Sequence, residues 1–161
     1  MKEEYKKLPL RSGVGIILLN KENKIFVAKR IDNPKNFWQM PQGGVNKNEN
    51  FLTAMKRELE EETSIKSIKV LKEIDNFFVY ELPKELLGII WKGKFRGQKQ
   101  KWFIVRFNGD ENEINLNTKH PEFIEWKWID INDLPKVIVN FKKNVYEKLL
   151  VELKKFFRSR A

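Results

Sequence analysis

The sequence predicts an α/β fold in which helices pack against a mixed sheet. Short apolar runs typical of strands occur along much of the chain, and one early segment has helical periodicity instead. A second helical segment closes the chain, where apolar residues recur at every fourth position. No internal repeat, low-complexity tract or flexible linker interrupts the 161 residues. We therefore expect a single domain that spans residues 1–161.

The first expected elements form a β-hairpin. Residues 14–19 and 25–29 are apolar runs, and the polar turn 20–23 separates them. A loop containing Pro34 follows. Residues 41–44, which read PQGG, should break any regular element, because proline lacks an amide donor and glycine permits unusual dihedral angles.

The next expected element is a helix that begins near Asn50 and ends near residues 63–64. Its apolar residues fall on one face of the helix, which the fold should bury. They are Phe51, Leu52, Met55 and Leu59.

The second half of the chain should add three strands and a helix. The strands are expected over residues 68–80, 101–107 and 125–129, and residues 82–99 should form a long basic loop. A C-terminal helix over 141–157 should dock through its apolar residues, with Asn140 as its N-cap.

The composition narrows the function classes. The chain has no cysteine, which excludes disulfides and thiolate metal sites. Residues 1–10 contain no apolar stretch suited to a signal peptide or a membrane span, so a cytoplasmic location is expected. The net charge of +10 favours a polyanionic partner. Codon bias that places lysine at exposed positions would explain the same charge.

Three glutamates form the clearest chemical signal. Glu58, Glu61 and Glu62 stand at i, i+3 and i+4, so one edge of the early helix presents all three carboxylates. Each like-charge pair destabilises a helix by roughly 0.2–0.5 kcal/mol, which a bound cation would offset. Oxygen ligands favour Mg²⁺ or Mn²⁺. The alternative is a solvated acidic face, but Lys56 and Glu60 already occupy the opposite side of the helix.

Residues 43–65, GGVNKNENFLTAMKRELEEETSI, resemble the signature box of the Nudix hydrolases. The matching positions are Gly43, Glu49, Arg57, Glu58, Leu59, Glu61, Glu62 and Ile65. One position departs, because Ser64 stands where the family has glycine. Glycine there ends the helix in a left-handed conformation, in which a Cβ costs about 1 kcal/mol.

The resemblance implies an α/β/α sandwich with a central mixed sheet, a box helix and a C-terminal helix. It also implies an enzyme that cleaves phosphoanhydride bonds with a divalent cation, Mg²⁺ or Mn²⁺. Glu58, Glu61 and Glu62 would bind the metal and carry the catalysis. Glu49 would pair with Arg57 and brace the motif that begins at Gly43.

Four further segments are similar to bacterial RNA pyrophosphohydrolases and the related diadenosine polyphosphate hydrolases. They are WQMPQGG at 38–44, GQKQKWF at 97–103, PEF at 121–123 followed by WKW at 126–128, and VNFK at 139–142. This similarity implies that Glu122 joins the metal site as a fourth carboxylate and shares in catalysis. It also implies a substrate site made of Arg11, Arg30, Tyr80, Val139, Phe141 and Lys142. Its arginines and lysine would contact phosphates, and the others would line a pocket for the first bases.

Each of these residues also has a plainer explanation. Glu122 could be an ordinary loop acid, the two arginines surface charges, Val139 a core residue and Phe141 the first apolar position of the last helix. Lys99 and Lys101 could guide a polyanion or protect an edge strand from aggregation. His120, the single histidine, is not the leading candidate for a general base.

The function we expect is removal of pyrophosphate from the 5′-triphosphate end of RNA, which leaves a 5′-monophosphate and promotes decay. Cleavage of dinucleoside polyphosphates is the close alternative, because both substrates place a polyphosphate beside a base. A catalytically silent RNA-binding module is the second alternative, and the three clustered glutamates argue against it. Neither DNA nor a membrane is an expected partner.

Overall fold

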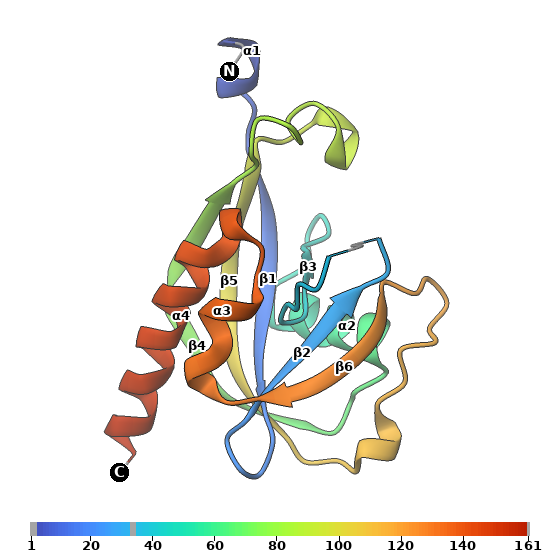
Figure 1. The fold of residues 1–161 in the computed structure, drawn as a ribbon, viewed down its shortest axis with the longest axis vertical. Helices are drawn as coiled ribbons and strands as arrows, with labels where there is room; N and C mark the ends of the chain where they lie inside the picture. Colours follow the sequence, from blue (N-terminus) through green and yellow to red (C-terminus); the bar gives the residue numbers. More distant parts are fainter. Residues whose placement is uncertain (1–2, 33–34, 161) are drawn as a thin grey trace.

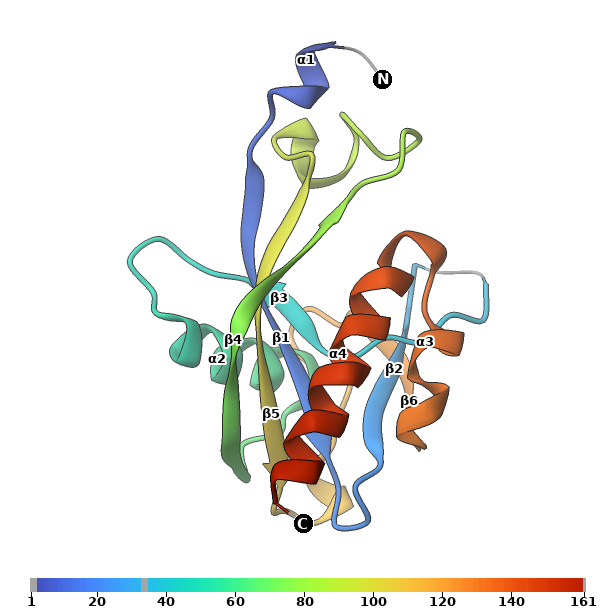
Figure 2. The same ribbon diagram turned by 90° about the vertical axis from the view of Figure 1, so that its left-hand side faces the viewer.

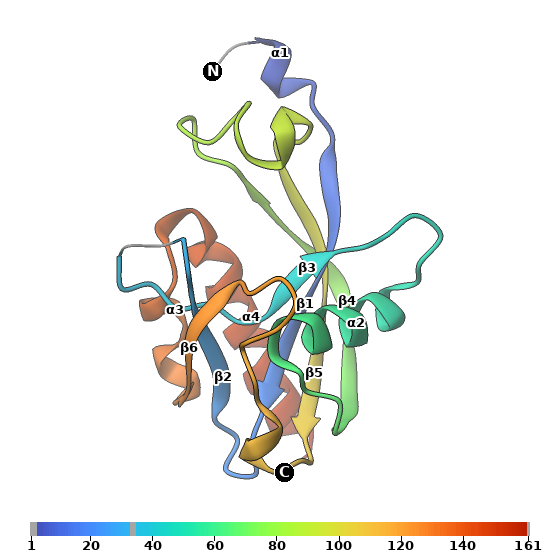
Figure 3. The ribbon, with the colours of Figure 1, turned by 90° about the vertical axis from the view of Figure 1, so that its right-hand side faces the viewer.

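The computed structural model describes residues 3–32 and 35–160, so the loop position Pro34 lies outside it. A curved sheet forms the centre of the molecule (Figure 1). Helix α2 (Phe51–Thr63) covers one face of the sheet and helix α4 (Asn140–Ser159) covers the other, as the two side views show (Figures 2 and 3). The expected α/β/α sandwich is therefore confirmed.

The sheet is mixed. Its strands are β1 (Leu10–Leu19), β2 (Ile25–Arg30), β3 (Gln42–Gly44), β4 (Ile68–Glu81), β5 (Gly97–Phe107) and β6 (Phe123–Ile129). The order is β4-β5-β1-β2-β6, and β3 pairs separately with β1. The pair β1–β5 is parallel and the other pairs are antiparallel. The expected hairpin is present, with Leu19 opposite Ile25.

The structure corrects two expectations about the strands. Residues 42–44 do not interrupt regular structure, because β3 pairs with β1, with Gly43 opposite Val14. Residues 97–99 belong to β5 and not to the preceding loop, since Gly97 pairs with Leu10 at the start of β1. Both pairings join segments far apart in the sequence, and local composition does not reveal them.

Both ends of α2 are where the sequence places them. The Asn50 side chain accepts a hydrogen bond from the Thr53 amide at 2.8 Å, which caps the first turn. Ser64 ends the helix in the left-handed conformation, with φ of 68°. Its amide donates to the Glu60 carbonyl at 2.8 Å.

The N-cap of α4 is Val139, so the expectation that Asn140 caps this helix is wrong. The sequence did not reveal the short helix α3 (Leu134–Val137) that precedes it. The chain leaves α3 through extended Ile138 and Val139, so Asn140 is already the first helical residue.

Two apolar layers hold the sandwich together, and β1 contributes to both. Ile17 faces the layer under α4, together with Trp102 and Leu149. Ile16 faces the layer under α2, together with Leu59. Because neighbouring strand residues point to opposite faces, one apolar strand fills both layers.

The ends of β1, β4 and β5 extend beyond the sandwich. There, residues 82–96 form a projection that we call the arm, which contains the 3₁₀ turn Ile90–Gly93. The arm lies beside α1 (Glu3–Lys6) at one end of the molecule (Figure 1). Within the described ranges, no helix is long and apolar enough to cross a membrane.

Candidate active site

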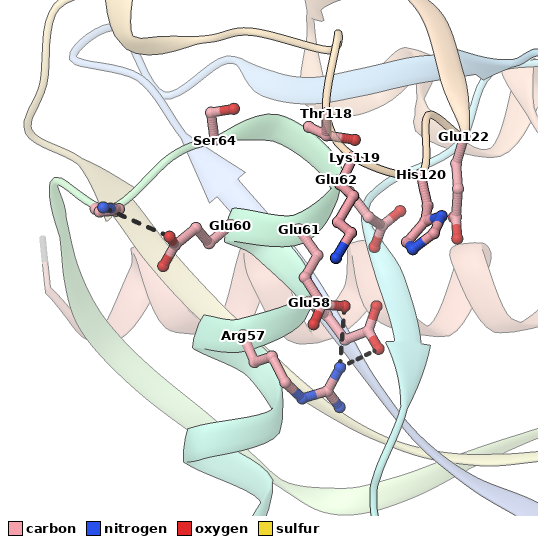
Figure 4. Close-up of a pocket in the computed structure, with 11 residues that line it drawn as sticks. Arg57, Glu58, Glu60, Glu61, Glu62, Ser64, Thr118, Lys119, His120 and Glu122 are labelled. Carbon is pink, nitrogen blue, oxygen red and sulfur yellow. Dashed lines mark hydrogen bonds and ion pairs between the residues drawn. The ribbon is translucent and has the colours of Figure 1, made fainter.

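One cavity gathers the four glutamates. Glu58, Glu61 and Glu62 come from α2, and Glu122 comes from the loop that leads into β6. Figure 4 shows these side chains around the same cavity, which is also lined by His120 of that loop. Four carboxylates from two distant segments therefore meet at one place.

Glu62 is a buried carboxyl group whose oxygens lack hydrogen-bond partners. Its side chain belongs to a residue only 2% exposed, and neither carboxylate oxygen has a hydrogen-bond partner. Burial raises the pKa of Glu62 well above its usual range, and repulsion from Glu122 and Glu58 adds to the shift. A buried carboxylate in this state is stabilised by a cation placed next to it.

Arg57 donates hydrogen bonds to Glu58 and Glu61, the other two glutamates that α2 contributes to this cluster. Its Nη1 donates to Glu58 Oε1 at 2.7 Å and to Glu61 Oε2 at 3.1 Å. Burial nevertheless raises the pKa of Glu58. Within the described ranges, no three acidic or histidine side chains are already arranged as a metal cage. The unpartnered oxygens of Glu62 and the all-oxygen donor set fit a hard divalent cation such as Mg²⁺ or Mn²⁺.

Arg57 also ties α2 to the chain before it. Its Nε and Nη2 donate to the two carboxylate oxygens of Glu49 at 2.8 and 2.9 Å, and Nη2 also donates to the Gly44 carbonyl at 2.8 Å. The Arg57 guanidinium lowers the pKa of Glu49 to about 2. The bidentate pair fixes the distance between the loop and the glutamates of the helix.

The adjacent glycines leave room for two charged side chains. A Cβ on Gly43 would lie 2.0 Å from Glu58 Cδ, and a Cβ on Gly44 would lie 2.2 Å from Arg11 Nη2. No role for Gly44 was evident from the sequence. The pair of glycines is the signal that points to it, because glycine allows the backbone to approach a side chain closely.

A groove of about 840 Å³ lies beside the glutamate cluster. Glu58 and Glu122 line it. All six residues of the expected substrate site also line it: Arg11, Arg30, Tyr80, Val139, Phe141 and Lys142. They come from β1, β2, β4 and the start of α4, so the fold brings together residues separated by more than a hundred positions.

The groove also contains two aromatic rings and a buried lysine. The rings of Tyr80 and Phe141 lie 5.7 Å apart, and Lys142 Nζ lies 5.2 Å from the Tyr80 ring centroid. Burial, with repulsion from Arg30, lowers the pKa of Lys142 to about 8. Burial also raises the pKa of Tyr80 to about 12. The site therefore presents a cation whose charge depends on pH near neutrality.

Arg30 has a partner that the sequence analysis missed. Its Nε and Nη2 donate to the Asp32 carboxylate at 2.8 and 2.9 Å, and Asp32 also lines the groove. This hydrogen-bonded pair raises the pKa of Arg30 and lowers that of Asp32.

The structure also tests the alternative explanations for Val139, Phe141 and the two lysines of β5. Val139 and Phe141 pack against the apolar layer under α4 while lining the groove, so packing and substrate contact are compatible. Lys99 and Lys101 do not protect an edge, because β5 lies between β4 and β1. Both ammonium groups lie over the Phe77 ring, at 4.6 and 4.8 Å, and neither lines the groove.

The model of the NUDIX domain matches residues 9–149 of this chain. The RNA pyrophosphohydrolase of Pelagibacter ubique (strain HTCC1062) is 63% identical over 154 residues, which cover 96% of this chain and 98% of that protein. The RNA pyrophosphohydrolase of Rhodospirillum rubrum is 48% identical over 149 residues, which cover 92% of this chain and 90% of that protein.

Solved structures agree on the fold. The E. coli dihydroneopterin triphosphate pyrophosphohydrolase superimposes with a TM-score of 0.69 at 18% identity, over 91% of this chain and 99% of that one. The C. elegans Ap4A hydrolase superimposes with a TM-score of 0.61 at 20% identity, over 94% and 99% of the two chains. With the family model matched over most of its length, the chain belongs to the NUDIX domain family.

Proposed function

We propose that this Nudix enzyme removes pyrophosphate from the 5′-triphosphate end of RNA and leaves a 5′-monophosphate. The observation that carries the proposal is the continuous groove from the glutamate cluster to the Tyr80 and Phe141 rings. Such a groove accommodates a polyphosphate and the adjacent base together. Its size lies within the usual range for ligand sites. The relatives named RNA pyrophosphohydrolase over nearly the full chain support the same assignment.

The cation-binding part of the proposal rests on the carboxylates. Nudix hydrolases generally need divalent metal ions, and we assign Mg²⁺ or Mn²⁺ to Glu58, Glu61, Glu62 and Glu122 here. Such an ion neutralises polyphosphate charge and lowers the pKa of a bound water. Arg57 holds Glu58 and Glu61 by hydrogen bonds that compete with metal binding. Its bidentate bond to Glu49 keeps the guanidinium in place when those two carboxylates turn to a cation.

The polyphosphate end of the substrate would lie between Arg11 and Arg30. Arg11 lies next to Gly44 and Arg30 lies at the end of β2, and both line the groove together with Glu58 and Glu122. Guanidinium groups bind phosphate oxygens through several donors at once, which orients the chain of phosphates toward the carboxylates.

The base end of the substrate would lie against Phe141, with the Lys142 ammonium close to a phosphate or a base edge. Stacking of one base on an aromatic ring contributes about 1–3 kcal/mol and tolerates any base. A base paired in a duplex does not offer its face for stacking. The enzyme should therefore favour RNA whose first bases are unpaired.

The experiment compares kcat/KM for three substrates with saturating Mg²⁺: a triphosphorylated RNA with an unpaired 5′ end, the same RNA with a paired 5′ end, and diadenosine tetraphosphate. We expect the unpaired RNA to be preferred. Phe141→Ala should lower its kcat/KM by about 5- to 150-fold, the equivalent of about 1–3 kcal/mol for one lost stack. Phe157→Ala, at the far end of α4, is the matched control and should retain the preference.

Two results would contradict the assignment. If the enzyme strongly prefers diadenosine tetraphosphate and turns over both RNAs equally slowly, its substrate is a dinucleoside polyphosphate. RNA binding without metal-dependent product would indicate a catalytically silent module.

A further inference from the structure

Arg11 and Arg30 are held in the groove in different ways. Arg30 is neutralised by two hydrogen bonds to Asp32. Arg11 forms no ion pair with any acidic side chain in the described ranges. Its guanidinium lies instead over the ring of Trp91, with Cζ 5.3 Å from the ring centroid. The charge of Arg11 is therefore not balanced by a carboxylate, unlike that of Arg30.

Building on the function proposed above, we propose that Trp91 is a positioning residue that holds Arg11 in place to bind the polyphosphate of the substrate. Two neighbours fix the position of the guanidinium. Its Cζ lies 5.3 Å from the centroid of the indole ring, and its Nη2 fills the space left by the missing Cβ of Gly44. Trp91, Gly44 and Arg11 line the same groove as Glu58, so this charge and the carboxylate share one site.

The backbone of the arm supports a specific role for Trp91. Trp91 and Lys92 adopt left-handed dihedral angles, with φ of 52° and 57°, and Gly93 follows with φ of 71°. Residues with a Cβ are disfavoured in this region, and such strain persists where the surrounding structure enforces it, often at ligand sites. The left-handed turn places the indole over Arg11.

The rest of the arm fixes this turn. The Trp91 carbonyl accepts a hydrogen bond from the Lys94 amide at 3.2 Å, and the Phe95 ring meets the indole edge-on at 6.2 Å between centroids. At the base of the arm, the Leu82 amide donates to the Arg96 carbonyl at 2.8 Å. The indole is thus held by its own segment before any ligand binds.

A neutral ring suits this task better than a carboxylate. An acidic partner would hold Arg11 but would also occupy its donors and repel the incoming phosphates. An aromatic face attracts the cation and leaves the N–H groups at the edge of the guanidinium available. The consequence is that Trp91 should affect affinity for polyphosphate even when the ligand carries no base.

The test uses inorganic tripolyphosphate, which has no base, and measures its Kd by calorimetry in the presence of Mg²⁺. Trp91→Ala should weaken binding by roughly 3- to 10-fold, the usual strength of a partly exposed cation–π contact. Trp91→Phe keeps an aromatic face and should recover most of the affinity. Ile89→Ala is the matched control, because Ile89 is in the same arm but is 67% exposed and does not line the groove.

A double-mutant cycle separates positioning from other roles. In the Arg11→Ala background, Trp91→Ala should cause little further loss of tripolyphosphate affinity. Independent, multiplying effects of the two substitutions would overturn the inference, as would unchanged affinity in Trp91→Ala alone. Equal losses in Trp91→Ala and Ile89→Ala would overturn it too, by showing general damage to the arm. RNA turnover by the wild type is measured in a separate experiment. The proposed function can therefore be refuted without changing the result for tripolyphosphate binding.

Discussion

Replacing Glu62 with glutamine should stabilise the metal-free protein while it removes activity. Glu62 is buried, its oxygens lack hydrogen-bond partners, and repulsion from Glu122 and Glu58 outweighs attraction by Arg30. An unsatisfied buried polar group costs about 1–3 kcal/mol, and a charged one costs more. The amide of glutamine retains part of that cost, so we expect a gain of about 1–2 kcal/mol in the free energy of unfolding near neutral pH.

The gain should depend on pH with a defined sign. The folded-state pKa of Glu62 lies above the usual value of 4.5. The contribution of this group to stability is therefore fully present below pH 4.5 and is lost as pH rises through the raised pKa. The wild type should lose stability over that range, and Glu62→Gln should not share this loss.

Urea unfolding with a chelator present, at about pH 5 and about pH 8, measures both effects. Glu60→Gln is the matched control, since Glu60 is exposed on the same helix and should show neither effect. Added Mg²⁺ should raise the stability of the wild type more than that of Glu62→Gln. Equal stability of wild type and Glu62→Gln at both pH values would refute the reasoning.

Three further predictions follow from single contacts. Ser64→Ala should destabilise the protein by about 1 kcal/mol, because the hydrogen bond from Ser64 to the Asn115 carbonyl is lost. Ser64→Gly should leave the stability nearly unchanged, because relief of the left-handed strain offsets that loss. Urea unfolding measures the stability of both variants. The KM for RNA should rise as pH increases through about 8, where Lys142 loses its proton, and Lys142→Arg should flatten this pH profile. Gly44→Ala should displace Arg11 and lower kcat/KM by roughly 10- to 100-fold, with a normal melting temperature measured alongside.

The helix that carries the glutamates was predictable because its signals are local. The start near Asn50, the buried Met55 and Leu59 and the stop near residues 63–64 all follow from one short segment, and the structure contains each of them. Leu52, which was expected on the buried face, is 41% exposed, so that part of the prediction is wrong. The sandwich was predictable for the same reason, since alternation and periodicity report which residues are buried.

Contacts between distant segments were not predictable from the sequence. Strand β3 forms only because Gly43 meets Val14 on β1, and three residues carry no strand signal of their own. The partners of the two arginines are equally hidden. Asp32 and Trp91 look like ordinary loop residues until the fold places them beside Arg30 and Arg11.

The family resemblance identified the groove residues, but it did not predict their pKa values. The lowered pKa of Lys142 arises from burial under the Tyr80 and Phe141 rings and from the nearby Arg30. These effects depend on the depth of each side chain in the folded protein, which the sequence does not state.

Product analysis with triphosphorylated RNA tests the central claim most directly. The products are followed for wild type, Glu61→Gln and Glu62→Gln, each with Mg²⁺ and with a chelator. We predict that the wild type releases pyrophosphate or phosphate and leaves RNA with a 5′-monophosphate only when the metal is present. Each variant should be slower by roughly 10²-fold or more. Turnover that survives chelation, or near-normal turnover of both variants at saturating Mg²⁺, would contradict the account.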